Sequence, residues 1–208
     1  GLPAAFADAH HLVAWQHGGR TDLSNAILVS RHLHRTHHEG GWRALPQHNP
    51  VHIYTVDRHL IEAAIQAAAL TRQVHRPDLL MIGALLHDVG KGLPGDHTDQ
   101  GMQLIASMGP ALGFDQADTA VLIQLCQHHL LLPETATRRD LDDPATVAAV
   151  VQALDNSDVD RPELLNLVAA LTEADAKATG PAAWSQWRAD LINELVQRTQ
   201  QALRGEAH

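Results

Sequence analysis

The sequence lacks the features that would place it among secreted or membrane proteins. It has a single cysteine, Cys126, in 208 residues, so no internal disulfide can form. No hydrophobic run approaches the roughly 18 residues of a membrane span, and no secretory signal is visible. These absences argue against a disulfide-stapled secreted domain and against an integral membrane protein. They predict a cytoplasmic protein in a reducing compartment, with no membrane partner.

Clustered positive charge is also missing from most of the chain. Residues 1–45 carry about +1, so the remaining residues carry about −10 of the formal net charge of −9. Neutralising nucleic-acid phosphates needs clustered Lys and Arg. The acidic part is therefore predicted not to bind nucleic acid.

A proline-containing stretch divides the chain into two parts. Pro46 and Pro50 lie in a segment without a periodic apolar face, which is typical of a boundary. We expect an N-terminal segment of residues 1–45 and a larger domain of residues 46–208. Because the chain opens on Gly1 rather than methionine, we also expect it to be cut from something longer.

The larger part has almost no strand signal and shows helical periodicity nearly throughout. Leu60, Ile61 and Ala64 recur on one face of a predicted helix over residues 56–74, and the apolar run 79–86 suits a buried helix. Further helices are expected at 98–108, 117–129, 144–154, 162–178 and 182–203. The predicted fold class is mainly α: an all-α bundle of six or seven helices, preceded by a small segment that contains the strand-like run 26–29.

Acids and histidines interrupt the apolar pattern of the larger part at three places. His87 and Asp88 follow the apolar run, His59 lies on the first amphipathic helix and Asp175 on a late one. Burying such groups is costly unless they are paired or bound to a metal. Ligands from separate helices of a bundle can converge on one ion. This order of His, His-Asp and a distant Asp resembles the HD superfamily of metal-dependent phosphohydrolases.

Three more histidines, His97, His128 and His129, lie between the second and the last of these positions. HD relatives with two metal ions place extra histidines there, so the resemblance implies a second ion. Only one of two neighbours on a helix need face a pocket. The sequence leaves open whether His128 or His129 does so.

Basic residues near the motif could contact a phosphate. Lys91, three residues after Asp88, could steer a phosphate as a point charge, and an exposed structural lysine is the alternative. Arg138 and Arg139 could grip the substrate or cap the next helix. We take Asp88 and Lys91 as candidate catalytic residues of the larger domain, and Lys91, Arg138 and Arg139 as candidate substrate-binding residues.

Four longer segments carry a closer resemblance. They are "HIYTVDRHLIEA" (52–63), "ALLHDVGKGLPGDHT" (84–98), "HHLLLPETATRRDLDDPATV" (128–147) and "LTEADAKATGPAAWSQW" (171–187). They are similar to the HD domain of the bifunctional uridylyltransferase/uridylyl-removing enzymes of the PII nitrogen-signalling protein. The chain shows no nucleotidyltransferase motif and no room for the glutamine-sensing ACT domains of those enzymes.

The resemblance implies a hydrolase that removes a nucleotidyl group, UMP or AMP, from a tyrosine of modified PII, its expected partner. It implies one or two ions held by His59, His87, Asp88 and Asp175. Mg²⁺ or Mn²⁺ is expected, although mixed His and Asp ligands leave Fe and Zn open. Such an ion would lower the pKa of a water and neutralise phosphodiester oxygens.

The N-terminal segment carries an independent histidine pattern. His10, His11, Asn25, His34 and His38, spaced by glycine turns, resemble the HNH nuclease motif, which forms a ββα-metal fold. The resemblance implies that His10, His34 and His38 hold a separate divalent ion and that His11 activates water. His34 and His38 are one helical turn apart, so both can face one ion.

Two other function classes remain open. One is an HNH-type DNA endonuclease, with DNA as partner and the helical part as scaffold; Ser30 and Leu33 stand where many HNH relatives carry Cys and His. The other is an inactive HD interaction module, which should lack at least one of the four core ligands. All four are present, so the nucleotidyl-protein hydrolase accounts for most of these residues.

Overall fold

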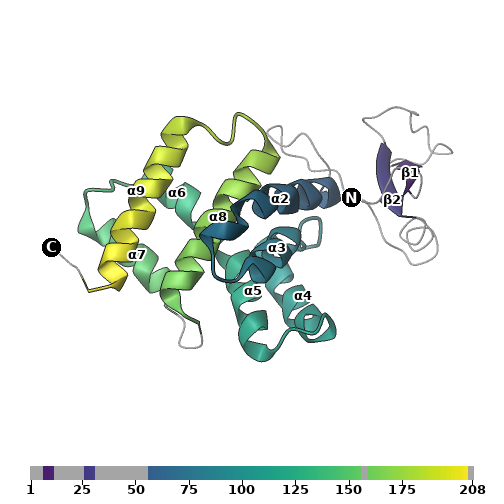
Figure 1. Cartoon of the computed structure of the whole chain (residues 1–208), viewed down its shortest axis with the longest axis horizontal. Helices are drawn as coiled ribbons and strands as arrows, with labels where there is room; N and C mark the ends of the chain where they lie inside the picture. The colour runs from purple at the N-terminus through teal and green to yellow at the C-terminus, as the bar shows by residue number, and fades with distance from the viewer. Residues whose placement is uncertain (1–6, 12–25, 31–55, 156–158, 206–208) are drawn as a thin grey trace.

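The structure is a computed structural model that describes residues 7–11, 26–30, 56–155 and 159–205, the first two ranges as backbone (Figure 1). Helices dominate these residues. The strands are β1 (Ala7–His11) and β2 (Ala26–Ser30); the helices are α2 (Val56–Leu70), the 3-10 helix η4 (Thr71–Gln73), α3 (Pro77–Leu86), α4 (His97–Ala111), α5 (Gln116–His128), α6 (Leu131–Arg138), α7 (Pro144–Ala153), α8 (Arg161–Thr179) and α9 (Gln186–Leu203). The predicted mainly α fold is confirmed.

The two strands pair in an antiparallel hairpin. His10 lies opposite Ile27 and His11 opposite Ala26. The strand-like run 26–29 of the sequence is therefore part of a strand. Asn25, His34 and His38 lie outside the described residues.

Aspartates at the ends of turns fix where several helices begin. The side chains of Asp96, Asp115, Asp143 and Asp160 accept backbone hydrogen bonds from the first turns of α4, α5, α7 and α8. These N–H groups have no partner within the helix, so an acidic cap satisfies them. Ser185 caps α9 in the same way. Proline follows the cap in α7 and α8, where its missing N–H costs nothing.

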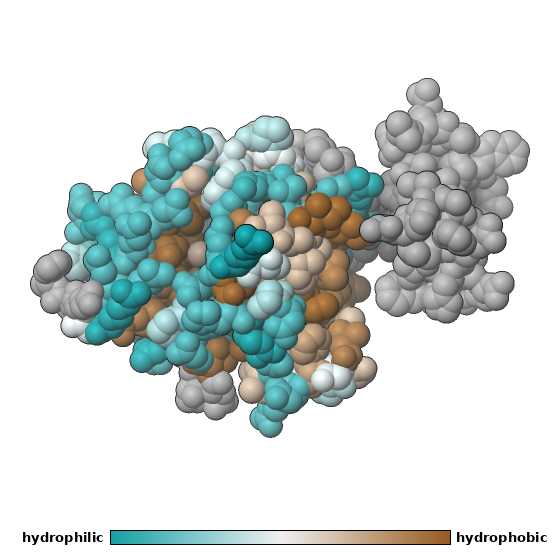
Figure 2. All heavy atoms as spheres, in the orientation of Figure 1, coloured by the Kyte–Doolittle hydropathy of each residue, from teal (hydrophilic) through white to brown (hydrophobic). Residues whose placement is uncertain are grey.

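Helix α8 lies at the centre of the bundle. It packs against α2, α3, α5, α6 and α9, while α4 packs on α5, and α6 and α7 pack on α9 (Figure 1). Leucines dominate the core: Leu164, Leu165 and Leu171 of α8 are fully buried. In Figure 2 hydrophilic side chains cover the α7 and α9 side of the viewed face, and more hydrophobic ones lie toward α2 and α3. No helix of the described part has the length and apolarity needed to cross a bilayer.

The number of helices and the start of the last one correct the sequence-based expectation. Residues 56–155 and 159–205 contain eight α-helices instead of six or seven, because α6 was not predicted. Pro133 is the third residue of α6, where a missing N–H breaks no helical bond, so the proline did not end a helix there. Helix α9 begins at Gln186, four residues later than expected, because Ser185 caps it.

Candidate metal centre

The His-Asp pair lies directly after a buried helix. Helix α3 ends at Leu86, and the His87 N–H still donates to the Gly83 carbonyl oxygen at 2.8 Å. Asp88 lies in the following turn, where its carbonyl accepts from the Lys91 N–H at 2.9 Å. The helix thus ends just where two buried polar side chains begin.

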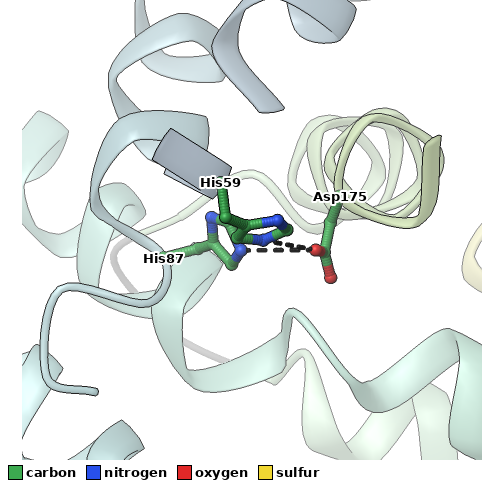
Figure 3. Close-up of side chains that lie close together, drawn as sticks. All are labelled: His59, His87 and Asp175. Atoms are coloured by element: carbon green, nitrogen blue, oxygen red, sulfur yellow. Dashed lines mark ion pairs between the residues drawn. The ribbon is translucent and has the colours of Figure 1, made fainter. Parts of the chain in front are cut away.

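His59, His87 and Asp175 form a first group of potential ligands (Figure 3). They come from α2, from the end of α3 and from α8. The Asp175 Oδ1 lies 2.9 Å from the His59 Nε2 and 3.6 Å from the His87 Nε2. The two imidazole rings lie edge to face, with centroids 5.4 Å apart. One ligand atom from each residue lies within 4.8 Å of the others, close enough for all three to hold one ion.

Asp88, His97 and His129 form a second group of the same kind. His97 is the first residue of α4, and His129 directly follows α5. The Asp88 Oδ1 lies 3.6 Å from the His129 Nε2 and 4.0 Å from the His97 Nε2. This group could hold a second ion.

Asp88 joins the two groups. Its other oxygen, Oδ2, lies 3.4 Å from the His87 Nε2 and 3.8 Å from the His59 Nε2. One carboxylate therefore reaches both groups, each through a different oxygen.

Backbone carbonyls orient two of the imidazole rings. The His87 Nδ1 donates to the Ala84 oxygen at 3.0 Å, and the His129 Nδ1 donates to the Cys126 oxygen at 2.6 Å. A carbonyl can only accept, so the proton is on Nδ1 and Nε2 is directed into the centre. This is the arrangement that metal-ligating histidines commonly show.

Burial of these groups fits a bound cation. His59, His87 and Asp88 are no more than 1 % exposed. Within the described part of the chain, the His87 Nε2, the Asp88 Oδ1 and the His97 Nε2 are buried and make no hydrogen bond. Buried polar atoms are normally bonded. Nitrogen and carboxylate donors that face one another in this way suit a divalent metal ion.

The electrostatics of the centre favour charged acids. Burial opposes a charge on His87, but the carboxylates of Asp88 and Asp175 outweigh it and raise the pKa of His87 to about 10. Burial likewise opposes charge on Asp88, but His87 and Lys91 lower its pKa below the ordinary value. Burial and the charge of His87 lower the pKa of His129. Ionised carboxylates and a neutral His129 are the forms that bind metals, and a metal ion at the His87 Nε2 would replace the second proton of that ring.

The structure separates His128 from its neighbour. The His128 Nε2 lies 3.1 Å from the Gln124 Oε1 one turn earlier, and His128 belongs to neither group. His129 therefore faces the centre, while His128 is a buried side chain with a partner of its own. Sequence spacing alone could not choose between them.

The basic candidates lie at different places around the centre. The Lys91 ammonium contacts the Asp88 Oδ2 directly. Arg138 is largely exposed, lies 3.4 Å from Glu134 and borders a pocket that Lys91 also lines. Arg139 directly follows α6 and is not among the residues that line that pocket.

A pocket of about 470 Å³ opens beside the metal groups. Lys91, His97, His129 and Asp175 line one end of it. Sequence reasoning missed several other residues that line it, among them Glu134, Thr172, Thr179, Trp184 and Arg188. Thr172 and Thr179 could have been found, because they stand three residues before and four after Asp175, on the same helical face.

The N-terminal histidines have no described side-chain geometry. His10 and His11 lie on β1, and His34 and His38 lie outside the described residues. A separate ion in this segment, and the HNH-like interpretation of residues 1–45, stay predictions.

Comparison with known families shows to which family the helical part belongs. Residues 56–176 match the family model of the HD domain. The chain belongs to the HD domain family. The match runs from the start of α2 to the residue after Asp175, so it includes both ligand groups. Family membership and the ligand geometry together support a metal-dependent phosphohydrolase.

Several bifunctional uridylyltransferase/uridylyl-removing enzymes are similar to this HD-domain chain. The enzyme from Streptomyces coelicolor is 61% identical over 164 residues, which cover 79% of this chain and 19% of that protein. The Mycobacterium tuberculosis enzyme is 49% identical over 165 residues, 79% and 20% of the two chains. The Gluconobacter oxydans enzyme is 39% identical over 174 residues, 76% and 18%. The predicted homology to the HD region of these enzymes is confirmed. The chain spans about a fifth of their length.

Proposed function

We propose that this HD domain hydrolyses the phosphodiester that links a nucleoside monophosphate to a tyrosine of modified PII protein. The observation that carries the proposal is the carboxylate of Asp88, which reaches two ligand groups at the end of a nucleotide-sized pocket. Relatives whose names include a uridylyl-removing activity support PII as the partner and UMP as the group removed. AMP is the alternative.

In this mechanism His59, His87, Asp88 and Asp175 would hold one ion, and Asp88, His97 and His129 a second. When bound, Mg²⁺ or Mn²⁺ would lower the pKa of a water and screen the charge on the phosphodiester oxygens. The buried Nδ1 bonds of His87 and His129 hold the rings in place, so the donors are arranged before the substrate arrives.

Basic residues beside the metal ligands would bind the substrate. Lys91 lies between Asp88 and the pocket, where its ammonium can bind a phosphate oxygen as a point charge. Arg138 borders the same pocket, and we assign it to the substrate side, with Arg139 next to it. The oxygen of water forms a bond to phosphorus while the bond from phosphorus to the tyrosine oxygen breaks. The proton of the water then ends on the tyrosine oxygen.

Replacing Asp88 by Asn tests the proposal. The change keeps size and removes the charge that both ligand groups share, so release of UMP from uridylylated PII in the presence of Mn²⁺ should fall at least about 10²-fold, because changes outside the ligand sphere already cost roughly 10- to 100-fold. Asp190→Asn on the exposed side of α9 is the matched control and should keep full activity. Metal content and thermal unfolding are measured on each variant. Unchanged turnover in a folded, metal-depleted Asp88→Asn protein would overturn the proposal.

A further inference from the structure

The pocket continues well beyond the residues that could hold metal. The turn between α8 and α9 and the first turn of α9 also line it, through Ala183, Trp184 and Arg188. So does the face of α8 that carries Thr172 and Thr179 on either side of Asp175. A phosphate held by the metal ligands would therefore have further pocket space next to it.

Trp184 links this part of the pocket to the hydrophobic core. It is partly buried and packs against the hydrophobic core, and it also lines the pocket. The turn before it is fixed by the Ala183 N–H, which donates to the Gly180 oxygen at 3.0 Å, and by the left-handed φ of 135° at Gly180. Ser185 caps α9 directly after it. A ring anchored from one side offers a preorganised surface for stacking.

Arg188 braces the same turn. Its Nη1 donates to the Ala183 carbonyl at 3.1 Å, directly before Trp184. A guanidinium has five N–H donors, and within the described part no carboxylate pairs with that of Arg188. Arg188 is thus a positioning residue for the tryptophan and also brings a cation to the pocket.

The Thr172 hydroxyl is an unusual group among the residues that line the pocket. Thr172 is 2% exposed, and its Oγ1 makes no hydrogen bond within the described part of the chain. A buried hydroxyl without a partner is unfavourable unless a ligand completes it. It lies one helical turn before Asp175, so it borders the same ligand space as the metal end.

We propose that this part of the pocket is the nucleoside subsite, in which the base stacks on Trp184 and the Thr172 hydroxyl bonds to the nucleoside. The proposal rests on the function proposed above, because it orients the same phosphodiester. Aromatic stacking accepts any base, and the pocket volume lies within the range of small-ligand sites. The tyrosine side of the substrate belongs to a folded protein and would stay outside the pocket.

Two aryl phosphodiesters distinguish an effect on base stacking from an effect on hydrolysis itself. Uridine 5′-(p-nitrophenyl phosphate) carries a nucleoside and a phenol leaving group, and methyl p-nitrophenyl phosphate lacks the nucleoside. The unmodified 208-residue chain with Mn²⁺ should prefer the uridine ester. Trp184→Leu, which keeps an apolar side chain without a ring, should lose about 5- to 150-fold in kcat/KM for the uridine ester, mostly through KM. Activity on the methyl ester should stay unchanged.

Two further variants make the result specific. Trp184→Phe keeps an aromatic face and should recover most of the preference. Trp187→Leu is the matched control, because Trp187 is 61% exposed and does not line the pocket. Equal preference for the uridine ester in Trp184→Leu and Trp184→Phe would overturn the subsite.

Binding supplies a readout that needs no turnover. Isothermal titration of UMP into each variant in Mg²⁺ should show weaker binding for Trp184→Leu and unchanged binding for Trp187→Leu. If uridylylated PII is not hydrolysed but UMP binding depends on Trp184, the nucleoside subsite is supported and the proposal that PII is the substrate is contradicted. If UMP binds equally to wild type and Trp184→Leu, the proposed nucleoside subsite is wrong, whether or not uridylylated PII is hydrolysed.

Discussion

Gly90 lies so close to His97 that no other residue fits at position 90. A Cβ on Gly90 would lie 2.0 Å from the His97 carbonyl oxygen and 2.5 Å from the Gly101 N. The turn after Asp88 is therefore pressed against the first turn of α4. This close approach places two members of the second ligand group, Asp88 and His97, next to each other.

Replacing Gly90 by Ala should separate those two ligands. The contacts that the new methyl group meets are backbone atoms, so α4 must shift, at a cost of about 1–3 kcal/mol. We expect a lower melting temperature and weaker binding of the second metal ion in a titration. Gly113→Ala is the control: its φ of 91° makes the change strained, but its surroundings are open. It should lower stability alone, and equal metal loss in both variants would contradict the packing argument.

The neighbours His128 and His129 should behave differently when changed. His129→Gln removes a nitrogen from the second group and should lower the number of bound ions and the hydrolytic rate at least about 10-fold. His128→Gln leaves both groups intact, because His128 bonds to Gln124 instead. Metal analysis and UMP release on the two variants compare them directly. A larger metal loss in His128→Gln would mean that the wrong histidine has been assigned to the centre.

Lys91 should matter for activity more than for folding. Lys91→Met removes the ammonium that lies beside Asp88 at the pocket, so kcat/KM should fall about 10- to 100-fold, in the range of a lost charged contact. Lys177→Met is the matched control: Lys177 lies on α8 two residues after Asp175 but pairs with Glu173. Steady-state rates with the uridine ester and thermal unfolding measure both effects. A Lys91→Met enzyme of normal rate would leave this lysine a structural role only.

Arg76, which is partly exposed, should make the free energy of unfolding depend on pH. Arg76 donates to Asp118 of α5 at 2.6 and 2.8 Å and to Asp78 of α3 at 3.0 and 2.7 Å. The bond from Arg76 lowers the pKa of Asp78 below 3.8. A carboxyl with a lowered pKa stabilises the fold above its unfolded pKa and loses that contribution as the pH falls through the folded one.

Arg76→Met should therefore lower the free energy of unfolding at pH 7 by up to about 1 kcal/mol, because the pairs are partly exposed. The difference from wild type should shrink as the pH falls below about 4, the ordinary pKa of an aspartate. Urea unfolding at several pH values measures it. Arg58→Met removes a pair within α2 and serves as a local comparison. A difference that grows on acidification has the wrong sign for this explanation.

The two parts of the chain should be separable. A protein of residues 46–208 should be soluble and helical by circular dichroism and should release UMP from PII, because the ligands of both described groups lie after residue 55. In the full chain, His11→Ala should leave that activity unchanged and abolish any metal-dependent DNA cleavage. Loss of PII hydrolysis in His11→Ala would show that the two histidine sets form one site.

Long periodic helices and the positions of His59, His87, Asp88 and Asp175 could be predicted from sequence. His59 and Asp175 interrupt apolar helices, and His87 and Asp88 directly follow one, which are local signals. The structure brings them together as a bundle should.

Features that depend on exact helix ends could not be predicted. Helix α6 is short and begins with a proline-containing turn, so its sequence looked like a loop. The start of α9 depends on the Ser185 cap and on the conformation of Gly180, and predicting a helix from 182 hid the turn that presents Trp184. Which of His128 and His129 faces the ligand groups depends on the packing of α5. The spacing of residues in the sequence does not reveal that packing.

The first ligand group joins α2 to α8, so its member His59 is synthesised well before its member Asp175. A nascent chain that ends before α8 has no Asp175 and cannot complete this group, however well its first helices fold. If the proposed hydrolysis needs this group, the domain stays inactive until α8 has been synthesised and has packed against α2.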